Sequence, residues 1–239
     1  MKYPSGKMIP IRLVMQKSNL ARNIAGLKLK INEIFYSLQG ESSAMGKPCV
    51  FIRLTYCNLR CSYCDTQYAF FEGTNKTIEE ILKKIESYRC NLVEITGGEP
   101  LLQKNVYPLM EILCDRGYQV MLETAGHMDI GGVDSRVKRI VDLKCPSSCE
   151  SDKNFWPNIN YLNKHDEVKF VIGGKHDFDW SKEILKRYRL AEKCHVLFSP
   201  VFGRIKLDQL ASWILEENLP VRMQLQLHKY IWSPDKRGV

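Results

Sequence analysis

Short apolar runs alternate with amphipathic segments along most of this chain, and this alternation constrains its fold more than any other feature. Apolar runs of four to eight residues favour strands, and apolar residues at helical spacing favour helices. We therefore expect strands at 27–31, 50–55, 92–96, 119–123, 139–144, 168–172, 195–198 and 221–228. Helices are expected after Thr77, which begins a capping box with Glu80, and near 106–113, 184–188 and 207–218. Strands joined by helices run parallel, with right-handed crossovers.

The 239 residues fall short of the ~250 that a full eightfold barrel needs. Both partial barrels and doubly wound sheets bind ligands at the C-terminal ends of their strands. Short segments that contain glycine or proline, as turns do, follow the expected strands at 97–100, 124–126, 145–146 and 173–174. The sequence therefore predicts one site at that edge of an α/β sheet.

Three cysteines, Cys57, Cys61 and Cys64, form a C-x3-C-x2-C run directly after the strand expected at 50–55. Thiolates are soft ligands for iron–sulfur clusters, zinc and copper. Because a structural zinc and a complete [4Fe–4S] cluster each need four ligands, three leave a metal corner open for a substrate or cofactor. A zinc loop is the alternative, with a fourth ligand from Cys49, Cys90, Cys145 or a histidine. Nine cysteines, an odd number, and the expected lack of a signal peptide disfavour a disulfide pair.

Further segments accompany the cysteines: 31–41, 51–54, and the Cys64-Asp65-Thr66 triplet. Together they resemble the radical S-adenosylmethionine (SAM) superfamily and, within it, the 7-carboxy-7-deazaguanine synthase family of queuosine and 7-deazapurine synthesis. The narrower resemblance depends on the Ser-Leu-Gln-Gly-Glu run at 37–41, on that triplet and on the tail at 228–238. It extends from about residue 30 to the C-terminus and implies a partial, open parallel β/α barrel. A doubly wound sheet is the alternative.

The resemblance implies a radical SAM carbon–nitrogen lyase. A [4Fe–4S] cluster would cleave SAM, and the resulting 5′-deoxyadenosyl radical would abstract hydrogen from C6 of 6-carboxy-5,6,7,8-tetrahydropterin. The ring would then contract with loss of ammonia to give 7-carboxy-7-deazaguanine, and SAM would be regenerated. Two other functions are considered: a glycyl-radical activating enzyme, which would act on a protein, and a non-enzymatic zinc module that binds RNA.

By the same resemblance, the three cysteines would bind three irons of the cluster, and Thr66 would bind Mg²⁺, an ion that commonly keeps several waters. Glycines at 97–98 let the backbone approach a ligand closely, and Glu99 offers a carboxylate to the methionine ammonium. The full set of expected SAM contacts is Tyr63, Asp65, Gly98, Glu99, Glu123, Lys144, Cys145, Pro146 and Ser147, with Ser199 as a further candidate.

The expected substrate contacts are Leu38, Gln39, Gly40, Arg53 and Thr96. Arg53 carries a bidentate guanidinium suited to the substrate carboxylate, and Glu41 is a further candidate for reading the pterin edge. The C-terminal residues at 228–229 and 237–239 are expected to close over the site. Two positions depart from the family, which commonly has glycine where this chain has Ser42 and Tyr56. Either substitution could alter the loop beside the site and its substrate contacts, and neither removes a cluster ligand.

Composition adds few constraints. Hydrophobic content of 44% and charged content of 26% are typical of a soluble globular protein, and no apolar run approaches the ~18 residues of a membrane span. We expect a cytoplasmic enzyme, since free cysteines suit a reducing compartment. The net charge of +8 comes from scattered residues, which favours a solvated surface over a nucleic-acid site.

An acidic reductant such as flavodoxin and a homodimer are expected by analogy. Residues 1–27 are expected to be an N-terminal extension and 28–239 the catalytic domain.

The expected last strand alternates strictly. Its apolar positions are Val221, Met223, Leu225 and Leu227, and its polar positions are Arg222, Gln224, Gln226 and His228. The polar face could meet water, as in many half-buried strands, or line the interior of a barrel. The sequence leaves both possibilities open.

Overall fold

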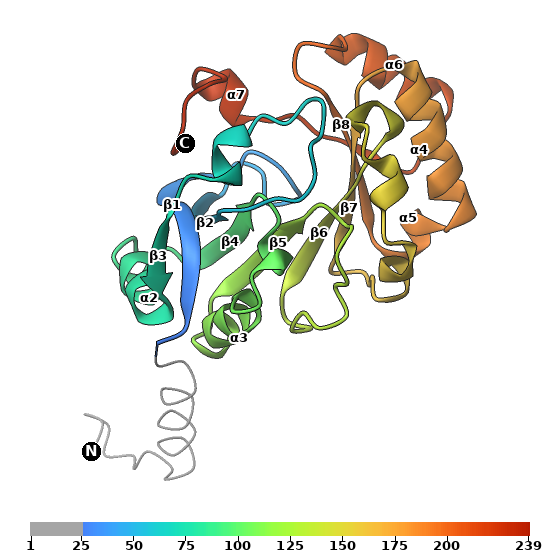
Figure 1. The fold of residues 1–239 in the computed structure, drawn as a ribbon. Coiled ribbons are helices and arrows are strands. Elements are labelled where there is room, and N and C mark those ends of the chain that lie inside the picture. Colours follow the sequence, from blue (N-terminus) through green and yellow to red (C-terminus); the bar gives the residue numbers. More distant parts are fainter. Residues whose placement is uncertain (1–25) are drawn as a thin grey trace, which may run out of the picture.

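A single curved, unclosed sheet organises the computed structural model, which describes residues 26–239 (Figure 1). The strand order in this part of the chain is β3-β1-β2-β4-β5-β6-β7-β8-β9. The strands are β1 (Lys28–Leu38), β2 (Pro48–Leu54), β3 (Thr74–Thr77), β4 (Leu92–Gly97), β5 (Gln119–Thr124), β6 (Lys138–Leu143), β7 (Glu167–Ile172), β8 (His195–Pro200) and β9 (Arg222–Met223). From β2 through β9 every neighbouring pair is parallel. The predicted open α/β barrel is confirmed.

Helices lie along the outside of the sheet, with α2 and α3 beside its first half and α4 to α6 beside its second half (Figure 1). The α-helices are α2 (Ile78–Glu86), α3 (Val106–Asp115), α4 (Lys175–Arg187), α5 (Leu190–Lys193), α6 (Leu207–Glu216) and α7 (His228–Ile231). Short 3-10 turns are η1 (Gln67–Phe70), η2 (Pro100–Leu102), η3 (Pro146–Ser148), η4 (Ser151–Lys153) and η5 (Trp156–Asn160). The predicted capping box is present, because Thr77 and Glu80 bond each other's backbone amides.

The two faces of the sheet differ in chemistry. In β7, Val168 and Phe170 join the apolar core beneath the helices, whereas Lys169 and Val171 face the interior. The same alternation in β4 places Ile95 in the core. Apolar side chains plug the N-terminal end of the interior: Ala44, Met121 and Ile140, with Leu92 beside them. Polar side chains are therefore concentrated toward the C-terminal ends of the strands.

Two expectations about strands need correction. The alternating pattern suggested parallel neighbours throughout, but β1 pairs antiparallel with both β2 and β3. A hairpin connection at 39–47 allows this, since antiparallel strands need no crossover helix. The last strand is also far shorter than 221–228, because only Arg222 and Met223 form the ladder with β8. Gln224 beyond it is buried, which fits the interior position for the polar face.

The predicted extension at 1–27 lies almost entirely outside the described residues, so the domain division stays a prediction. Within the described residues, no helix is long and apolar enough to cross a membrane.

Candidate active site

A cavity of about 850 Å³ opens at the C-terminal ends of the parallel strands. The loop after β2 arches over this edge of the sheet, and α7 and the C-terminus lie beside β1 (Figure 1). Cys57, Cys61 and Cys64 line the cavity together with the residues at 38–41 and at 234–239. Segments from both ends of the described chain therefore meet the cysteine loop, defined here as residues 57–64, around one space.

The thiols of Cys57, Cys61 and Cys64 are free and partly buried. Burial raises the pKa of all three, and that of Cys61 reaches about 11, although the nearby charge of Lys144 opposes the shift. Metal binding requires thiolates, so loading the site would release protons. A positive group beside the thiols favours the charged form that binds iron.

The cysteine loop rests directly on the end of β4, and Gly98 makes this possible. A methyl group there would collide with the carbonyl oxygen of Tyr56 and lie 2.9 Å from Cβ of Cys57. In return, the Glu99 amide donates to that Tyr56 carbonyl at 2.8 Å. The glycines at 97–98 thus allow the end of β4 to pack against the loop that follows β2. This packing role does not depend on a contact with a cofactor.

The two departures from the family pattern fall where the backbone is left-handed. Ser42 has φ of 62° and Tyr56 has φ of 81°, the region that favours glycine. A non-glycine residue there costs about 1–2 kcal/mol. Local contacts offset the cost: the Ser42 amide donates to Gln224 at 2.6 Å, and the Tyr56 amide donates to Ala69 at 2.9 Å. The loops keep a glycine-like path despite the substitutions.

A single zinc ion fits this geometry poorly. Within residues 26–239, no group of three or more His, Cys, Asp or Glu side chains converges as one ion requires. Cubane ligands have no such requirement, because each cysteine binds a different iron. Two of the suggested fourth zinc ligands, Cys49 and Cys145, are buried away from the cavity lining. Three cysteines that line one cavity have the arrangement that a cluster needs, with one iron bound by each thiolate.

Lys169 lies at the centre of a charged network on the inner face of the sheet. Its ammonium pairs with Glu41 at 2.9 Å, with Glu123 at shorter range, and approaches Asp142 at 3.7 Å. Burial acts to lower the pKa of Lys169, but the surrounding carboxylates outweigh it and raise the pKa well above its usual value. For Glu41 burial acts upward, yet the charge of Lys169 holds its pKa below the usual value. Lys169 and Glu41 are therefore ionised together.

The network contains more carboxylates than the single charge of Lys169 can balance. Asp142 is also paired with Lys144 at 2.9 Å. Burial raises the pKa of Glu123, and raises that of Glu94 well above its usual value. The Glu94 carboxylate accepts from the Gln39 side chain. Glu94 and Glu123 therefore keep a proton to higher pH than an ordinary glutamate would, and both line the cavity.

Most predicted SAM contacts line the cavity: Tyr63, Asp65, Gly98, Glu123 and Lys144. Glu99, in contrast, is fully buried, and its carboxylate accepts from Thr124 at 2.9 Å and from the Ala125 amide at 2.8 Å. It joins the ends of β4 and β5. Its carboxylate is thus bonded within the protein, and the contact with SAM stays a prediction.

Cys145, Pro146 and Ser147 also lie outside the cavity lining. The buried Cys145 thiol is 3.4 Å from the Ser181 hydroxyl. The Ser147 amide donates to Asp177 at 2.9 Å, while the Ser147 carbonyl accepts from Ser62 at 2.6 Å. Ser147 therefore supports the cysteine loop from the side away from the cavity, and the SAM contacts of all three residues stay predictions. Ser199 is buried too and is absent from the lining.

The predicted substrate residues all line the cavity: Leu38, Gln39, Gly40, Arg53 and Thr96. Arg53 donates from Nε to Glu33 at 2.8 Å, and within residues 26–239 its two Nη groups have no hydrogen-bond partner. Gly40 admits His228, whose ring nitrogen would collide with any side chain there. Gln39 differs from the other four residues because both ends of its side-chain amide are already bonded within the protein. Its nitrogen donates to Glu94, and its oxygen accepts from the Glu41 amide.

Sequence reasoning missed Lys169, Asp142 and Glu94. Each is a charged residue inside an apolar strand, a position where an unpaired charge is costly. That signal could have identified them, because period-two alternation places each of them opposite the core face. Asp142 and Lys169 are direct partners across β6 and β7, which only the strand register reveals.

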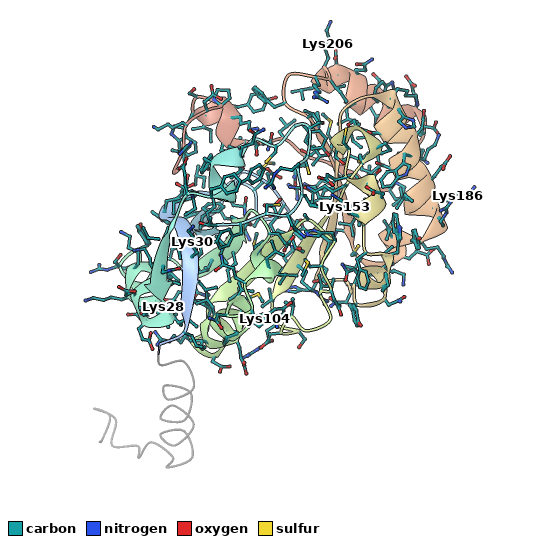
Figure 2. The ribbon with its side chains drawn as sticks, viewed as in Figure 1. Lys28, Lys30, Lys104, Lys153, Lys186 and Lys206 are labelled. Atoms are coloured by element: carbon teal, nitrogen blue, oxygen red, sulfur yellow. The ribbon has the colours of Figure 1, made fainter. Side chains whose placement is uncertain are left out.

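Six lysines show how part of the positive charge is distributed. The labelled lysines Lys28, Lys30, Lys104, Lys153, Lys186 and Lys206 spread over different sides of the molecule (Figure 2). This distribution agrees with a solvated surface rather than a continuous nucleic-acid track.

Comparisons with known proteins match the part of the chain that carries the three cysteines. The model of the radical SAM superfamily matches residues 51–211. The 7-carboxy-7-deazaguanine synthase of Chlorobaculum tepidum is 48% identical over 214 residues, covering 88% of this chain and 97% of that protein. The protein of the same name from Koribacter versatilis is 42% identical over 226 residues, covering 88% of this chain and all of that protein. The crystal structure of QueE from Escherichia coli has the same fold, with a TM-score of 0.74 over 87% of this chain and 98% of that one at 22% identity.

Gly98→Ala tests the packing of the cysteine loop. We expect it to lower stability by about 1–3 kcal/mol, because the added methyl overpacks the contact with Tyr56 and Cys57. Thiol-reagent titration of the cluster-free protein should show faster labelling of the three cysteines. Gly132→Ala is the matched control, since a methyl there meets Tyr107 at an ordinary 3.4 Å. Equal labelling rates in both variants would contradict the packing role.

Lys169→Met tests the inner network. Removing the only cation that contacts both Glu41 and Glu123 within the described residues should cost about 3–5 kcal/mol of unfolding free energy. The stranded carboxylates then have raised pKa values, so the folded state binds more protons than the unfolded state and stability falls as pH rises. Urea unfolding should therefore show a larger deficit at pH 8 than at pH 5.5. Lys182→Met, which removes an exposed pair with Glu217, should cost less than about 1 kcal/mol at either pH.

Proposed function

Because the chain belongs to the radical SAM superfamily and, within it, to the 7-carboxy-7-deazaguanine synthase family, we propose that its cavity converts 6-carboxy-5,6,7,8-tetrahydropterin into 7-carboxy-7-deazaguanine with loss of ammonia. The observation that carries this proposal is the meeting of Cys57, Cys61 and Cys64 with Arg53 and Thr96 around one space. Similarity over nearly the full length of proteins with that name disfavours both a glycyl-radical activating enzyme and an RNA-binding zinc module.

The three cysteines would hold three irons of a [4Fe–4S] cluster and leave the fourth for SAM. When bound, the cluster and SAM supply the 5′-deoxyadenosyl radical that abstracts hydrogen from the substrate. The protein positions and shields these groups. Gly98 keeps the loop close to the strand ends, and Lys144 places a positive charge beside the thiols.

We assign the SAM contacts to the cavity-lining members of the predicted set, chiefly Tyr63, Gly98 and Lys144. Lys144 is nearly buried and already paired with Asp142, so its position is fixed before a ligand arrives. A fixed cation beside the cluster also suits the carboxylate of SAM.

Substrate recognition is assigned to the opposite wall. Arg53 is held by Glu33 through Nε, which leaves its two Nη groups for the substrate carboxylate. Thr96 donates to Glu123 at 3.3 Å, so the pterin would meet a wall of carboxylates backed by Lys169. Burial raises the pKa of Glu123, which makes its carboxyl a better proton acceptor than an ordinary glutamate beside the bound pterin. Ring contraction with loss of ammonia requires such proton transfers.

Mg²⁺ binding is assigned to Thr66. Its hydroxyl lines the cavity and donates to Asp65 at 2.9 Å. Burial acts to raise the pKa of Asp65, but Lys229 at 2.5 Å outweighs it and the pKa falls well below the usual value. Asp65 therefore stays ionised beside the hydroxyl. A hard cation with few protein ligands, several waters and a substrate carboxylate suits this arrangement.

The remaining assignments concern the C-terminal segment, the cellular compartment and the partners. The C-terminal residues at 234–239 line the cavity, and Arg237 stacks over Tyr68 at 3.8 Å, as expected for a segment that closes the site. The nine free cysteines suit a reducing cytoplasm. A homodimer and a flavodoxin-type reductant are proposed by analogy alone.

Anaerobic reconstitution followed by a product assay tests the function. The wild-type chain should hold about four irons and four sulfides and release ammonia from the carboxytetrahydropterin. Cys61→Ala should form no 5′-deoxyadenosine, because one iron loses its ligand. Cys114→Ala, in α3 and away from the cavity lining, should retain activity. Persistent 5′-deoxyadenosine formation by Cys61→Ala would refute the ligand assignment.

Thr66→Ala tests the magnesium assignment. We expect the Mg²⁺ concentration for half-maximal activity to rise at least tenfold, because the only protein ligand assigned to the ion is lost. Thr66→Ser keeps the hydroxyl and should retain a dependence within about threefold of wild type. If Thr66→Ala responds to Mg²⁺ as the wild type does, Thr66 is not a ligand.

A further inference from the structure

A second loop, residues 146–153, holds the cysteine loop from the side away from the cavity. The Ser62 amide donates to the Ser148 carbonyl at 3.0 Å, and the Ser62 hydroxyl donates to Ser147. The Arg60 amide donates to the carboxylate of Glu150. The contacts fall on both sides of Cys61, so this ligand is held from two neighbouring positions.

Glu150 is an unusual residue at such a contact. It is only 4% exposed, although glutamate is rarely buried unless paired. One carboxylate oxygen accepts from the Arg60 amide, and the other lies 2.5 Å from the Lys153 ammonium. Burial acts to raise the pKa of Glu150, but these two partners outweigh it and the pKa lies below its usual value. The carboxylate is therefore charged and fixed.

The other half of the cysteine loop is held in a similar way. Arg60 donates from Nη1 to the Cys57 carbonyl at 2.8 Å, and its guanidinium lies 4.2 Å from the ring centre of Phe70. On the far side, the His127 ring contacts the Asn58 side chain at 2.6 Å. These contacts hold the backbone of the cysteine loop at several points. Glu150 and the cysteines therefore keep a fixed position relative to each other.

We propose that Glu150 is a positioning residue that fixes the cysteine loop and, together with Lys153, sets the reduction potential of the cluster. This rests on the proposed function, since it assumes a cluster on Cys57, Cys61 and Cys64. The reduction potential of such a cluster depends on nearby charge, on hydrogen bonding and on solvent exposure. A fixed negative charge behind Cys61 opposes the addition of an electron. Lys153 acts in the opposite direction, and its side chain is 48% exposed, so solvent screens its charge.

The test is a potentiometric titration of the reconstituted full-length protein, followed by electron paramagnetic resonance without SAM or substrate. Glu150→Gln keeps an oxygen for the Arg60 amide and removes the charge. It should raise the equilibrium constant for reduction two- to tenfold, where tenfold corresponds to a 59 mV rise for one electron. Lys153→Gln should lower that constant. Asp152→Asn, an exposed residue in the same 3-10 turn, is the matched control and should leave it unchanged within 1.5-fold.

The outcomes separate this inference from the assigned function. A wild-type chain that holds no cluster refutes the function itself. A wild-type cluster whose reduction is unaffected by Glu150→Gln overturns the inference alone, and so does an equal shift in Asp152→Asn. If Glu150→Gln fails to fold, the exposed Lys153→Gln variant decides, because an unchanged potential there also overturns the inference. A purely structural role for Glu150 would lower cluster content in Glu150→Ala without opposite shifts in the two charge variants.

Discussion

The pairing of Lys169 with buried carboxylates is the constraint on which the site depends. A curved sheet with helices on one face must fill or hydrate its other face, and here that face carries charged residues from four successive strands: Glu94, Glu123, Asp142 and Lys169. Burying such groups is costly unless they are paired. Lys169 supplies the pairing and allows a polar cavity at the strand ends, above an apolar plug.

The same constraint connects the two halves of the cavity. Glu41 comes from the β1–β2 hairpin and is bonded by Lys169, by Gln224 and by Gln226. Gln226 also reaches Asp65, next to the cysteine loop. The hairpin, the C-terminal segment and the loop after β2 therefore share one hydrogen-bond network. This network connects the substrate wall to the loop that carries the cysteines.

The predicted elements were most accurate where a local pattern decides the structure. The capping box at Thr77 and the apolar runs of β4 to β8 depend on neighbouring residues alone, and they formed as expected. The expected strand at 221–228 failed, because its polar alternation reflects contacts with Glu41 more than a ladder with β8. The bonding partners of Glu99 could not be read from the sequence for a related reason. A carboxylate after two glycines looks available in sequence, and only the neighbouring β5 shows that Thr124 and Ala125 occupy it.

By itself, the sequence determined the α/β class, the edge of the sheet that bears the candidate site, and the grouping of Cys57, Cys61 and Cys64 in one loop, since spacing and periodicity are local properties of a chain. Tertiary structure alone decided which side chains share the cavity. Lys169 meets Glu41 across 128 positions, and Arg60 meets Glu150 across 90. Such pairings follow from strand order and loop docking, which place distant residues in contact and have no signature in the spacing of either partner.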